Sequence, residues 1–188
     1  MVASEAAPFA KTGGLADVVA ALPRALARLG HSVDVVIPRY RGVIAGEPIG
    51  QVTVPLGRQV QTATVYGVTE AGVRTIFVGH AGYFDRDYLY GPAGHDYPDN
   101  PERFAFLCRA ALEWAVSSGE RYDAIHAHDW QAGLVPVLLR DFTAPGLRGV
   151  STVFTIHNLA YQGIFDASWL PRLGLGWLLS PATKLAAT

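Results

Sequence analysis

The sequence predicts an α/β fold, built as a Rossmann-like open parallel sheet with helices on both faces. Short apolar, strand-like runs alternate with segments whose apolar residues recur every three or four positions, which is the order typical of such a sheet. Half of the 188 residues are hydrophobic and 16% are charged, a globular composition. This length suits one domain with a sizeable core and is too short for two full domains.

The first part of the chain has the order strand, loop, helix, strand. Residues 2–4 look like the end of a buried strand, and residues 5–14 form the loop that follows. Apolar residues from 15 to 29 recur at helical spacing, and Gly30 is a suitable stop just past that helix. Residues 33–37 are an apolar, β-branched run typical of a buried parallel strand. These segments together predict a βαβ unit.

A hairpin and a helix are predicted in the middle of the chain. Residues 60–68 alternate in polarity and residues 73–78 return after a turn, so we expect a hairpin or two adjacent strands. Residues 80–98 are rich in Gly, Tyr, Asp and Pro and predict a long functional loop. A helix then begins with Asn100 as its cap and Pro101 in its first turn.

The last part of the chain continues the alternation. We expect a strand at residues 122–126, a helix at 131–140 and a strand at 150–157. Residues 167–188 have no clear period. The single cysteine, Cys108, falls on the core stripe of the helix that follows Pro101.

Composition excludes several classes of protein. A formal net charge of -1 does not suggest a nucleic-acid-binding surface. One cysteine cannot form an internal disulfide framework, and a reducing compartment is the default for such a chain. No apolar run is long enough to span a bilayer, and the N-terminus does not resemble a signal peptide. We therefore expect a cytoplasmic protein.

Three polar clusters each follow a predicted strand directly. They lie at residues 11–14, 126–130 and 157–163. Ligands of open α/β sheets bind at the carboxyl ends of the strands, where these clusters are expected to meet. Their common position is more informative than any one of them.

The first cluster suits an anion. Gly13 and Gly14 precede a helix, where backbone N–H groups and the helix dipole favour negative charge, and Lys11 adds a full positive charge. The order of residues fits neither a Walker loop nor a G-x-G-x-x-G loop. The alternative is an ordinary glycine turn beside an exposed lysine.

The second cluster has three interpretations. His126 and His128 alternate and therefore point to one face of a strand, and with Asp129 and His157 they have the residue types of a catalytic zinc site. Alternatively, Asp129 accepts hydrogen bonds from sugar hydroxyls and Trp130 offers an apolar face to a sugar. The third possibility is a pair of histidines that only satisfies backbone groups.

The third cluster suits a neutral ligand. His157 and Asn158 end a strand, and Tyr161 and Gln162 follow in a loop that contains Gly163. Small polar and aromatic groups around a glycine can hydrogen-bond a neutral molecule. An ordinary polar loop is the alternative.

With these clusters in place, the sequence resembles the bacterial glycogen synthase and plant starch synthase family. Four strings carry the resemblance, in the family's order and spacing: SEAAPFAKTGGLADVVAALPRAL from Ser4, YPDNPERFAFLCRAALE from Tyr97, HAHDWQAGLVP from His126 and FTIHNLAYQGIF from Phe154. They span nearly the whole chain, from residue 4 to about residue 165.

The resemblance implies a retaining glucosyltransferase that extends an α-1,4-glucan from ADP-glucose. It also implies two Rossmann-like domains in the GT-B arrangement. Residues 1–188 would be the N-terminal, acceptor-side domain, with the first strand clipped, the C-terminal nucleotide domain absent and no activity in isolation. The alternatives are an isolated glucan-binding module and a metallohydrolase that uses His126 and His128.

The resemblance also implies roles for particular residues, with no metal and no cofactor. His157 and Asp129 match the catalytic positions around the transferred glucose. The residues on the donor side are Lys11, Gly13, Gly14 and Asp17. The residues that bind the acceptor or the glucose are Trp130, Asn158, Tyr161 and Gln162.

Overall fold

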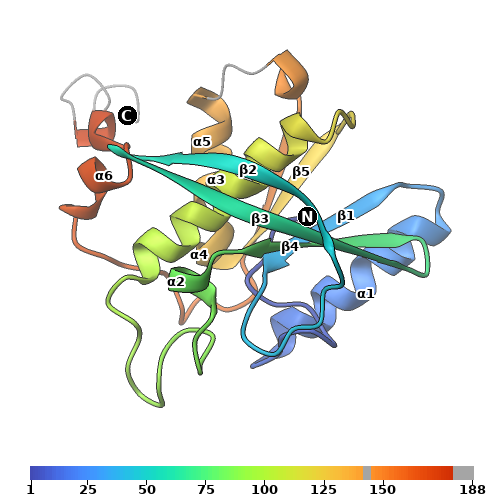
Figure 1. Ribbon diagram of the computed structural model, residues 1–188, viewed down its shortest axis with the longest axis horizontal. Helices are drawn as coiled ribbons and strands as arrows, with labels where there is room; N and C mark the ends of the chain where they lie inside the picture. The colour runs from blue at the N-terminus through green and yellow to red at the C-terminus, as the bar shows by residue number, and fades with distance from the viewer. Residues whose placement is uncertain (142–144, 180–188) are drawn as a thin grey trace.

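A computed structural model describes residues 1–141 and 145–179 as an α/β domain (Figure 1). The strands are β1 (Val33–Pro38), β2 (Pro48–Leu56), β3 (Gln59–Glu70), β4 (Val73–Gly79), β5 (Ala124–His128) and β6 (Ser151–Thr155). The longer helices are α1 (Gly14–Arg28), α3 (Asn100–Ser117) and α5 (Leu134–Asp141). The shorter ones are α2 (Ala81–Phe84), α4 (Asp129–Ala132), α6 (Trp169–Arg172), η1 (Pro145–Leu147) and η2 (Gly176–Leu179).

Val2 joins two groups of strands into one layer. The first group has the order β1-β4-β3-β2, and the second is the pair β5-β6. Val2 forms parallel bridges to Val36 on β1 and to Ala127 on β5. Its N–H donates to the carbonyl of His126 at 2.8 Å, and the N–H of His128 donates to its carbonyl at 3.0 Å. The chain therefore contains a run of parallel strands, as predicted, with the segment at Val2 in its middle.

The other edge of the sheet is antiparallel, so the sheet is mixed. β3 pairs antiparallel with both β4 and β2, which confirms the predicted hairpin. β2 was not predicted, because it contains Pro48 and Pro55. A proline has no backbone N–H to donate, so prolines argue against a central strand. β2 is an edge strand and pairs on one side only, so it tolerates both prolines.

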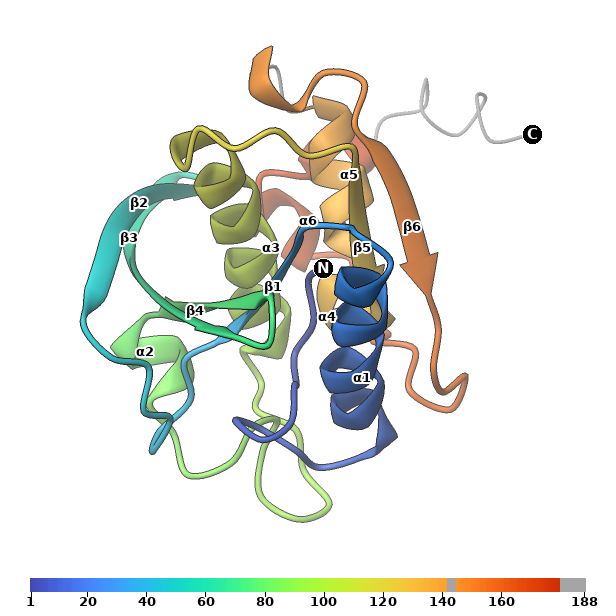
Figure 2. The same ribbon diagram turned by 90° about the vertical axis from the view of Figure 1, so that its right-hand side faces the viewer.

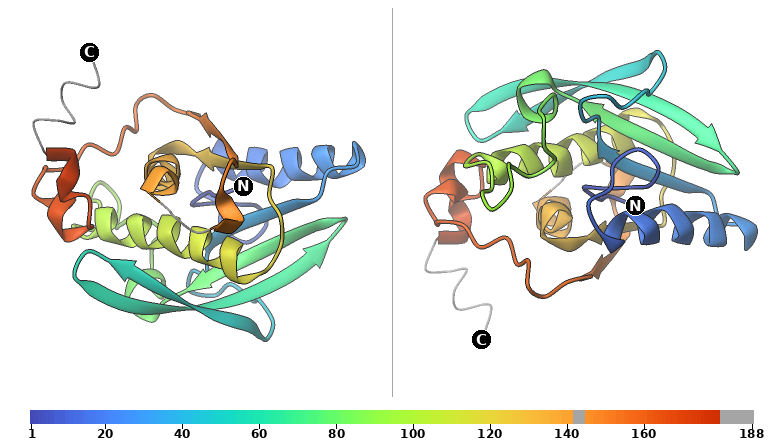
Figure 3. Two further views of the ribbon diagram at one scale, coloured as in Figure 1. Left: turned by 90° about the horizontal axis from the view of Figure 1, so that it is seen from above. Right: turned by 90° about the horizontal axis from the view of Figure 1, so that it is seen from below.

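Helix α3 packs between the β2–β3 hairpin and α5 (Figure 3). A Cβ atom at Gly50 would lie 3.2 Å from the ring of Trp114, so the glycine allows β2 to approach this helix. The predicted core stripe of α3 is buried and comprises Phe104, Leu107, Cys108, Ala111 and Ala115. Burial raises the pKa of the Cys108 thiol to about 12, and its Sγ donates to the carbonyl of Gln131 at 3.3 Å.

Some element boundaries differ from the predicted ones. Asp99, rather than Asn100, occupies the N-cap position of α3. The side-chain amide of Asn100, which is buried, donates to the carbonyl of Tyr90 instead. The helix predicted at residues 131–140 is divided at Gly133 into α4 and α5. Residues 167–179 contain two short helical segments, and residues 180–188 lie outside the described part. Within that part, no helix has both the length and the apolar character needed to cross a membrane.

Candidate functional site

The three predicted clusters lie at the carboxyl ends of adjacent parallel strands. The loop with Lys11 follows the strand segment at Val2, Asp129 directly follows β5, and His157 comes two residues after β6. Figure 2 shows β6 running toward the end of the molecule where the loop before α1 lies. The three clusters therefore share one rim of the sheet, the edge at the carboxyl ends of these strands, as predicted. The roles predicted for their residues stay predictions.

Lys11 forms an ion pair with Asp17. Its Nζ lies 2.6 and 2.8 Å from the two carboxylate oxygens of Asp17, and both side chains are about half exposed, at 52% and 59%. Exposed pairs of this kind contribute about 0–1 kcal/mol. Lys11 can therefore exchange Asp17 for an anionic ligand at little cost in free energy.

Glu5 organises the loop that carries Lys11. It is only 3% exposed, and its carboxylate accepts hydrogen bonds from the N–H of Thr12 (2.5 Å), the hydroxyl of Thr12 (2.7 Å) and the N–H of Gly13 (3.3 Å). The N–H of Gly13 thus has a buried carboxylate as its partner, and the predicted place of this glycine on the donor side stays a prediction. Helix α1 still begins without a side-chain cap, so its first amides remain suited to an anion.

Tyr90 connects this loop to residues 80–98, which were predicted as one long loop but contain α2 at their start. Its hydroxyl donates to Glu5 at 2.5 Å and accepts from the hydroxyl of Ser4 at 2.7 Å. Burial raises the pKa of Tyr90, so the phenol stays protonated and remains a donor. Glu5 was not among the predicted site residues, although it organises the loop that carries Lys11. The signal was an acidic residue inside an otherwise apolar run at the end of a strand.

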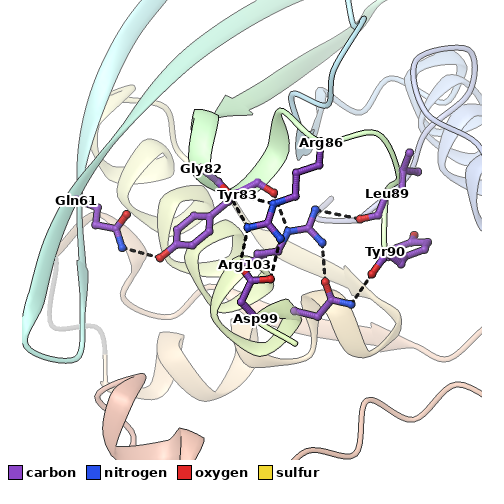
Figure 4. A network of polar contacts seen from close by, with 9 residues as sticks. Gln61, Gly82, Tyr83, Arg86, Leu89, Tyr90, Asp99 and Arg103 are labelled. Atoms are coloured by element: carbon purple, nitrogen blue, oxygen red, sulfur yellow. Dashed lines mark hydrogen bonds and ion pairs between the residues drawn. The ribbon is translucent and has the colours of Figure 1, made fainter. Parts of the chain in front are cut away.

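A buried guanidinium holds the loop around Tyr90 (Figure 4). Arg103 on α3 is fully buried and donates to the carbonyls of Tyr83 (2.7 Å) and Leu89 (3.0 Å) and to the side-chain oxygen of Asn100 (2.6 Å). The amide of Asn100 in turn donates to the carbonyl of Tyr90 at 2.9 Å. The loop is thus attached to the first turn of α3, and this attachment fixes the position of Tyr90.

Near Arg103, Arg86 makes a bidentate ion pair with Asp99. Its two terminal guanidinium nitrogens lie 2.8 and 2.5 Å from the two carboxylate oxygens. Asp99 precedes α3, whereas Arg86 lies within the loop. The pair closes the loop at its base, so both ends of the segment that presents Tyr90 are held.

Three histidines stack in a row at the ends of β5 and β6. The ring centroids of His126 and His128 are 4.0 Å apart, and those of His128 and His157 are 5.2 Å apart. This confirms that the first two share one face of the strand. His128 is fully buried, and its Nδ1 lies 2.9 Å from Nε2 of His157. Burial, followed by the neighbouring His126 and His157, lowers the pKa of His128 to about 3, so its ring is neutral near pH 7.

Asp129 fixes the backbone of His157. Its carboxylate accepts the N–H of His157 at 2.7 Å. Asp129 itself has φ +55°, a left-handed conformation that aspartate tolerates better than most residues. The two residues predicted to be catalytic are therefore in direct contact.

Residues 1–141 and 145–179 contain no ligand set for the metal site that was one interpretation of the second cluster. No three His, Cys, Asp or Glu side chains in this part are arranged to hold a metal ion. The rings of His128 and His157 hydrogen-bond to each other, and the Asp129 carboxylate binds a backbone N–H. These groups already use one another as partners.

The predicted acceptor residues divide into two places. Asn158 adjoins His157, and its side chain accepts the N–H of Ala160 at 2.9 Å. Trp130, Tyr161 and Gln162 instead line a hollow of about 710 Å³ whose other walls are mainly apolar. One face of the Trp130 indole is covered by Gly163, where a Cβ atom would lie 2.6 Å from the ring. The predicted sugar platform is thus partly occupied by the chain itself.

We expect Glu5→Gln to loosen the Lys11 loop without unfolding the protein. The glutamine side chain keeps one acceptor oxygen but turns an N–H₂ group toward donors that the carboxylate now satisfies. A lost charge-assisted hydrogen bond is worth about 1.5–3 kcal/mol, so exchange of the Thr12 and Gly13 amides should accelerate at least about 10-fold. Amide exchange followed by NMR measures this. The exposed Glu47→Gln variant is the matched control, and unchanged exchange in Glu5→Gln would contradict this role of Glu5.

We expect His128 to destabilise the fold in acid. Its folded-state pKa of about 3 lies below the unfolded value near 6.5, so the unfolded chain binds more protons between these limits. The contribution of neutral His128 to the free energy of unfolding is therefore fully present above about pH 6.5. It falls as the pH drops toward 3, by up to about 1.4 kcal/mol per pH unit. Urea unfolding between pH 7 and 4 gives the free energy of unfolding as a function of pH. This dependence should be shallower for His128→Asn than for wild type or for the exposed His31→Asn. Equal slopes would contradict the assignment.

The chain matches the family described as starch synthase catalytic domain over residues 1–186. It is 48% identical over 189 residues to a glycogen synthase from Koribacter versatilis, covering 97% of this chain and 39% of that protein. A glycogen synthase from Anaeromyxobacter sp. is 51% identical over 182 residues, covering 94% and 38%. The solved catalytic domain of Starch Synthase IV from Arabidopsis thaliana, bound to ADP and acarbose, aligns with a TM-score of 0.83 and 35% identity, covering 96% and 38%.

The sheet, its covering helices and the polar rim define a Rossmann-like half of a GT-B glycosyltransferase fold. The chain belongs to the starch synthase catalytic-domain family. It spans 38–39% of the length of the relatives it matches.

Proposed function

We propose that residues 1–188 form the N-terminal, acceptor-side domain of a glucan synthase. This enzyme would transfer glucose from ADP-glucose, with retention, to the non-reducing end of an α-1,4-glucan. The observation that carries the proposal is the rim itself: an anion-suited loop with Lys11 lies one strand away from the Asp129–His157 pair. The relatives named glycogen synthase and the Arabidopsis structure bound to ADP and acarbose support this choice of substrates.

The proposed chemistry follows where charge develops. Breaking the bond between glucose and phosphate places negative charge on the departing diphosphate, which preorganised cations and N–H donors stabilise. Lys11 and the uncapped start of α1 at Gly14 would supply this stabilisation, with Gly13 at the N-cap and Asp17 in the first turn of α1 beside Lys11. His157 and Asp129 would bind the transferred glucose.

The remaining roles are also proposals. Asn158 would contact the acceptor beside His157, and Trp130, Tyr161 and Gln162 would bind it farther from the reacting atoms. We place the reaction in the cytoplasm, a reducing compartment in which a lone thiol such as that of Cys108 persists. No cofactor is required, because the donor sugar already carries its leaving group.

Transfer is expected to need more than these residues. Residues 1–188 alone should bind maltoheptaose but should not incorporate labelled glucose from ADP-glucose into glycogen. A chimera that continues from residue 188 into the remaining part of the Koribacter versatilis glycogen synthase should incorporate it. This comparison also tests the alternative that the chain is an isolated glucan-binding module.

The outcomes separate the two functions. A folded chimera that binds maltoheptaose and ADP-glucose but transfers nothing would favour the binding module. Rapid turnover by residues 1–188 alone would contradict the proposal that the active site is completed by a second domain. The unmodified Koribacter enzyme is the positive control.

A further inference from the structure

The row of histidines contains one member that the proposed function does not use. His157 is the predicted sugar-binding residue, and His126 bonds Thr155 on β6 through its Nε2, at 2.7 Å. His128 lies between them and is fully buried. Its Nδ1 faces Nε2 of His157 at 2.9 Å, whereas its own Nε2 is buried and has no partner among the described residues.

The position of the shared proton follows from this unequal environment. If His157 donated from Nε2, the neutral ring of His128 would carry its proton on the buried Nε2, where no acceptor is available. A buried N–H without a partner is rarer and costlier than a buried lone pair. Protonating both nitrogens of His128 would place a charge in the core, and burial opposes this. The favoured arrangement is therefore donation from Nδ1 of His128 to Nε2 of His157.

We propose that His128 is a positioning residue that holds His157 in its Nδ1–H tautomer. The second nitrogen of His157 then points a donor, rather than a lone pair, away from His128. That ring is only partly buried, and its Nδ1 has no partner among the described residues. A hydroxyl or ether oxygen of a bound sugar is the type of acceptor that fits such a donor.

The surroundings hold both rings in place. His126 stacks on one side of His128 and is tied to β6 through Thr155. Asp129 binds the backbone N–H of His157, so the main chain and the ring of that residue are both fixed from the β5 side. A donor held in this way loses little conformational freedom when a ligand binds.

The direct test reads the tautomers in the 188-residue chain. Long-range ¹H–¹⁵N correlation spectra at pH 7.5 distinguish Nδ1–H from Nε2–H for each histidine. We expect the Nδ1–H form at both His128 and His157. An Nε2–H signal at His157 in the wild-type protein overturns the proposal by itself, so the test does not depend on any variant folding.

Two substitutions separate positioning from packing. In His128→Asn the amide nitrogen can occupy the place of Nδ1 and donate, so His157 should keep its Nδ1–H form. In His128→Leu no donor remains, and His157 should shift toward the Nε2–H form that free histidine prefers. An unchanged His157 in His128→Leu would contradict the proposal.

The functional consequence rests on the proposed transfer reaction and has its own readout. In the chimera, His128→Leu should lower kcat about 10-fold, which corresponds to one hydrogen bond, and His128→Asn should restore most of it. If the tautomers are as expected but the chimera transfers no glucose, the proposed function fails and the positioning role stands. If transfer occurs and both variants are as active as the wild type, the positioning role fails.

Discussion

Replacing Arg103 with methionine should lower the free energy of unfolding by about 3–5 kcal/mol. The guanidinium is fully buried and satisfies the carbonyls of Tyr83 and Leu89 as well as the side chain of Asn100. Methionine fills a similar volume but removes the donor from three acceptors, two of them in buried hydrogen bonds and one in a part-buried one. Burial lowers the pKa of Arg103, which reflects the cost of desolvating the charge, and relief of that cost offsets part of the loss.

Urea unfolding measures this change, and Arg121→Met just beyond α3 is the matched control, because that arginine is exposed. We expect less than about 0.5 kcal/mol for the control. Limited proteolysis gives a second readout, since residues 85–99 should become sensitive in Arg103→Met at temperatures where the protein remains folded. Equal stability of the two variants would contradict the structural role assigned to Arg103.

Lys11→Ala should reduce glucose transfer by the chimera about 10- to 100-fold. One charge-assisted hydrogen bond contributes about 1.5–3 kcal/mol, and a contact that strengthens as charge develops on the diphosphate acts mainly on the transition state. The ion pair with Asp17 is exposed, so breaking it should change the free energy of unfolding by less than about 1 kcal/mol. The measurement is incorporation of labelled glucose from ADP-glucose.

Two further variants serve as controls for the effect of Lys11→Ala. Lys11→Arg keeps the charge and should retain more activity than Lys11→Ala, and Arg28→Ala removes an exposed charge at the other end of α1 and should leave transfer unchanged. A chimera that is indifferent to Lys11→Ala would remove this lysine from the donor site.

The sequence predicted the parallel part of the fold and the rim better than the antiparallel edge. The apolar runs before Asp129 and His157 form β5, which is mostly buried, and β6, which is exposed, and both are followed by polar residues, a pattern that is local in the sequence. β2 was missed because two prolines and Gly50 weaken its local signal, and its place is decided by packing against Trp114, more than 60 positions farther along the chain. Tertiary contacts of that kind leave no trace in a short window of sequence.

The same limit applies to the partners of the polar groups at the site. The direction of the Gly13 N–H depends on Glu5, and the place of Glu5 depends on Tyr90, which lies 85 positions away along the chain. His126 and His128 look equivalent in the sequence, but only His128 is fully buried and bonded to His157. The order of the parallel strands could be predicted, with β5 displaced from the predicted 122–126 and β6 shorter than the predicted 150–157, whereas the partner of each polar atom could not.

The buried thiol of Cys108 makes the protein its own reporter of unfolding. With no solvent access and a pKa near 12, this sulfur is inert toward alkylating reagents in the native state. In the unfolded chain an ordinary thiol reacts readily. The rate of alkylation under native conditions therefore counts the openings that expose α3, without any introduced label and at a single chemical position.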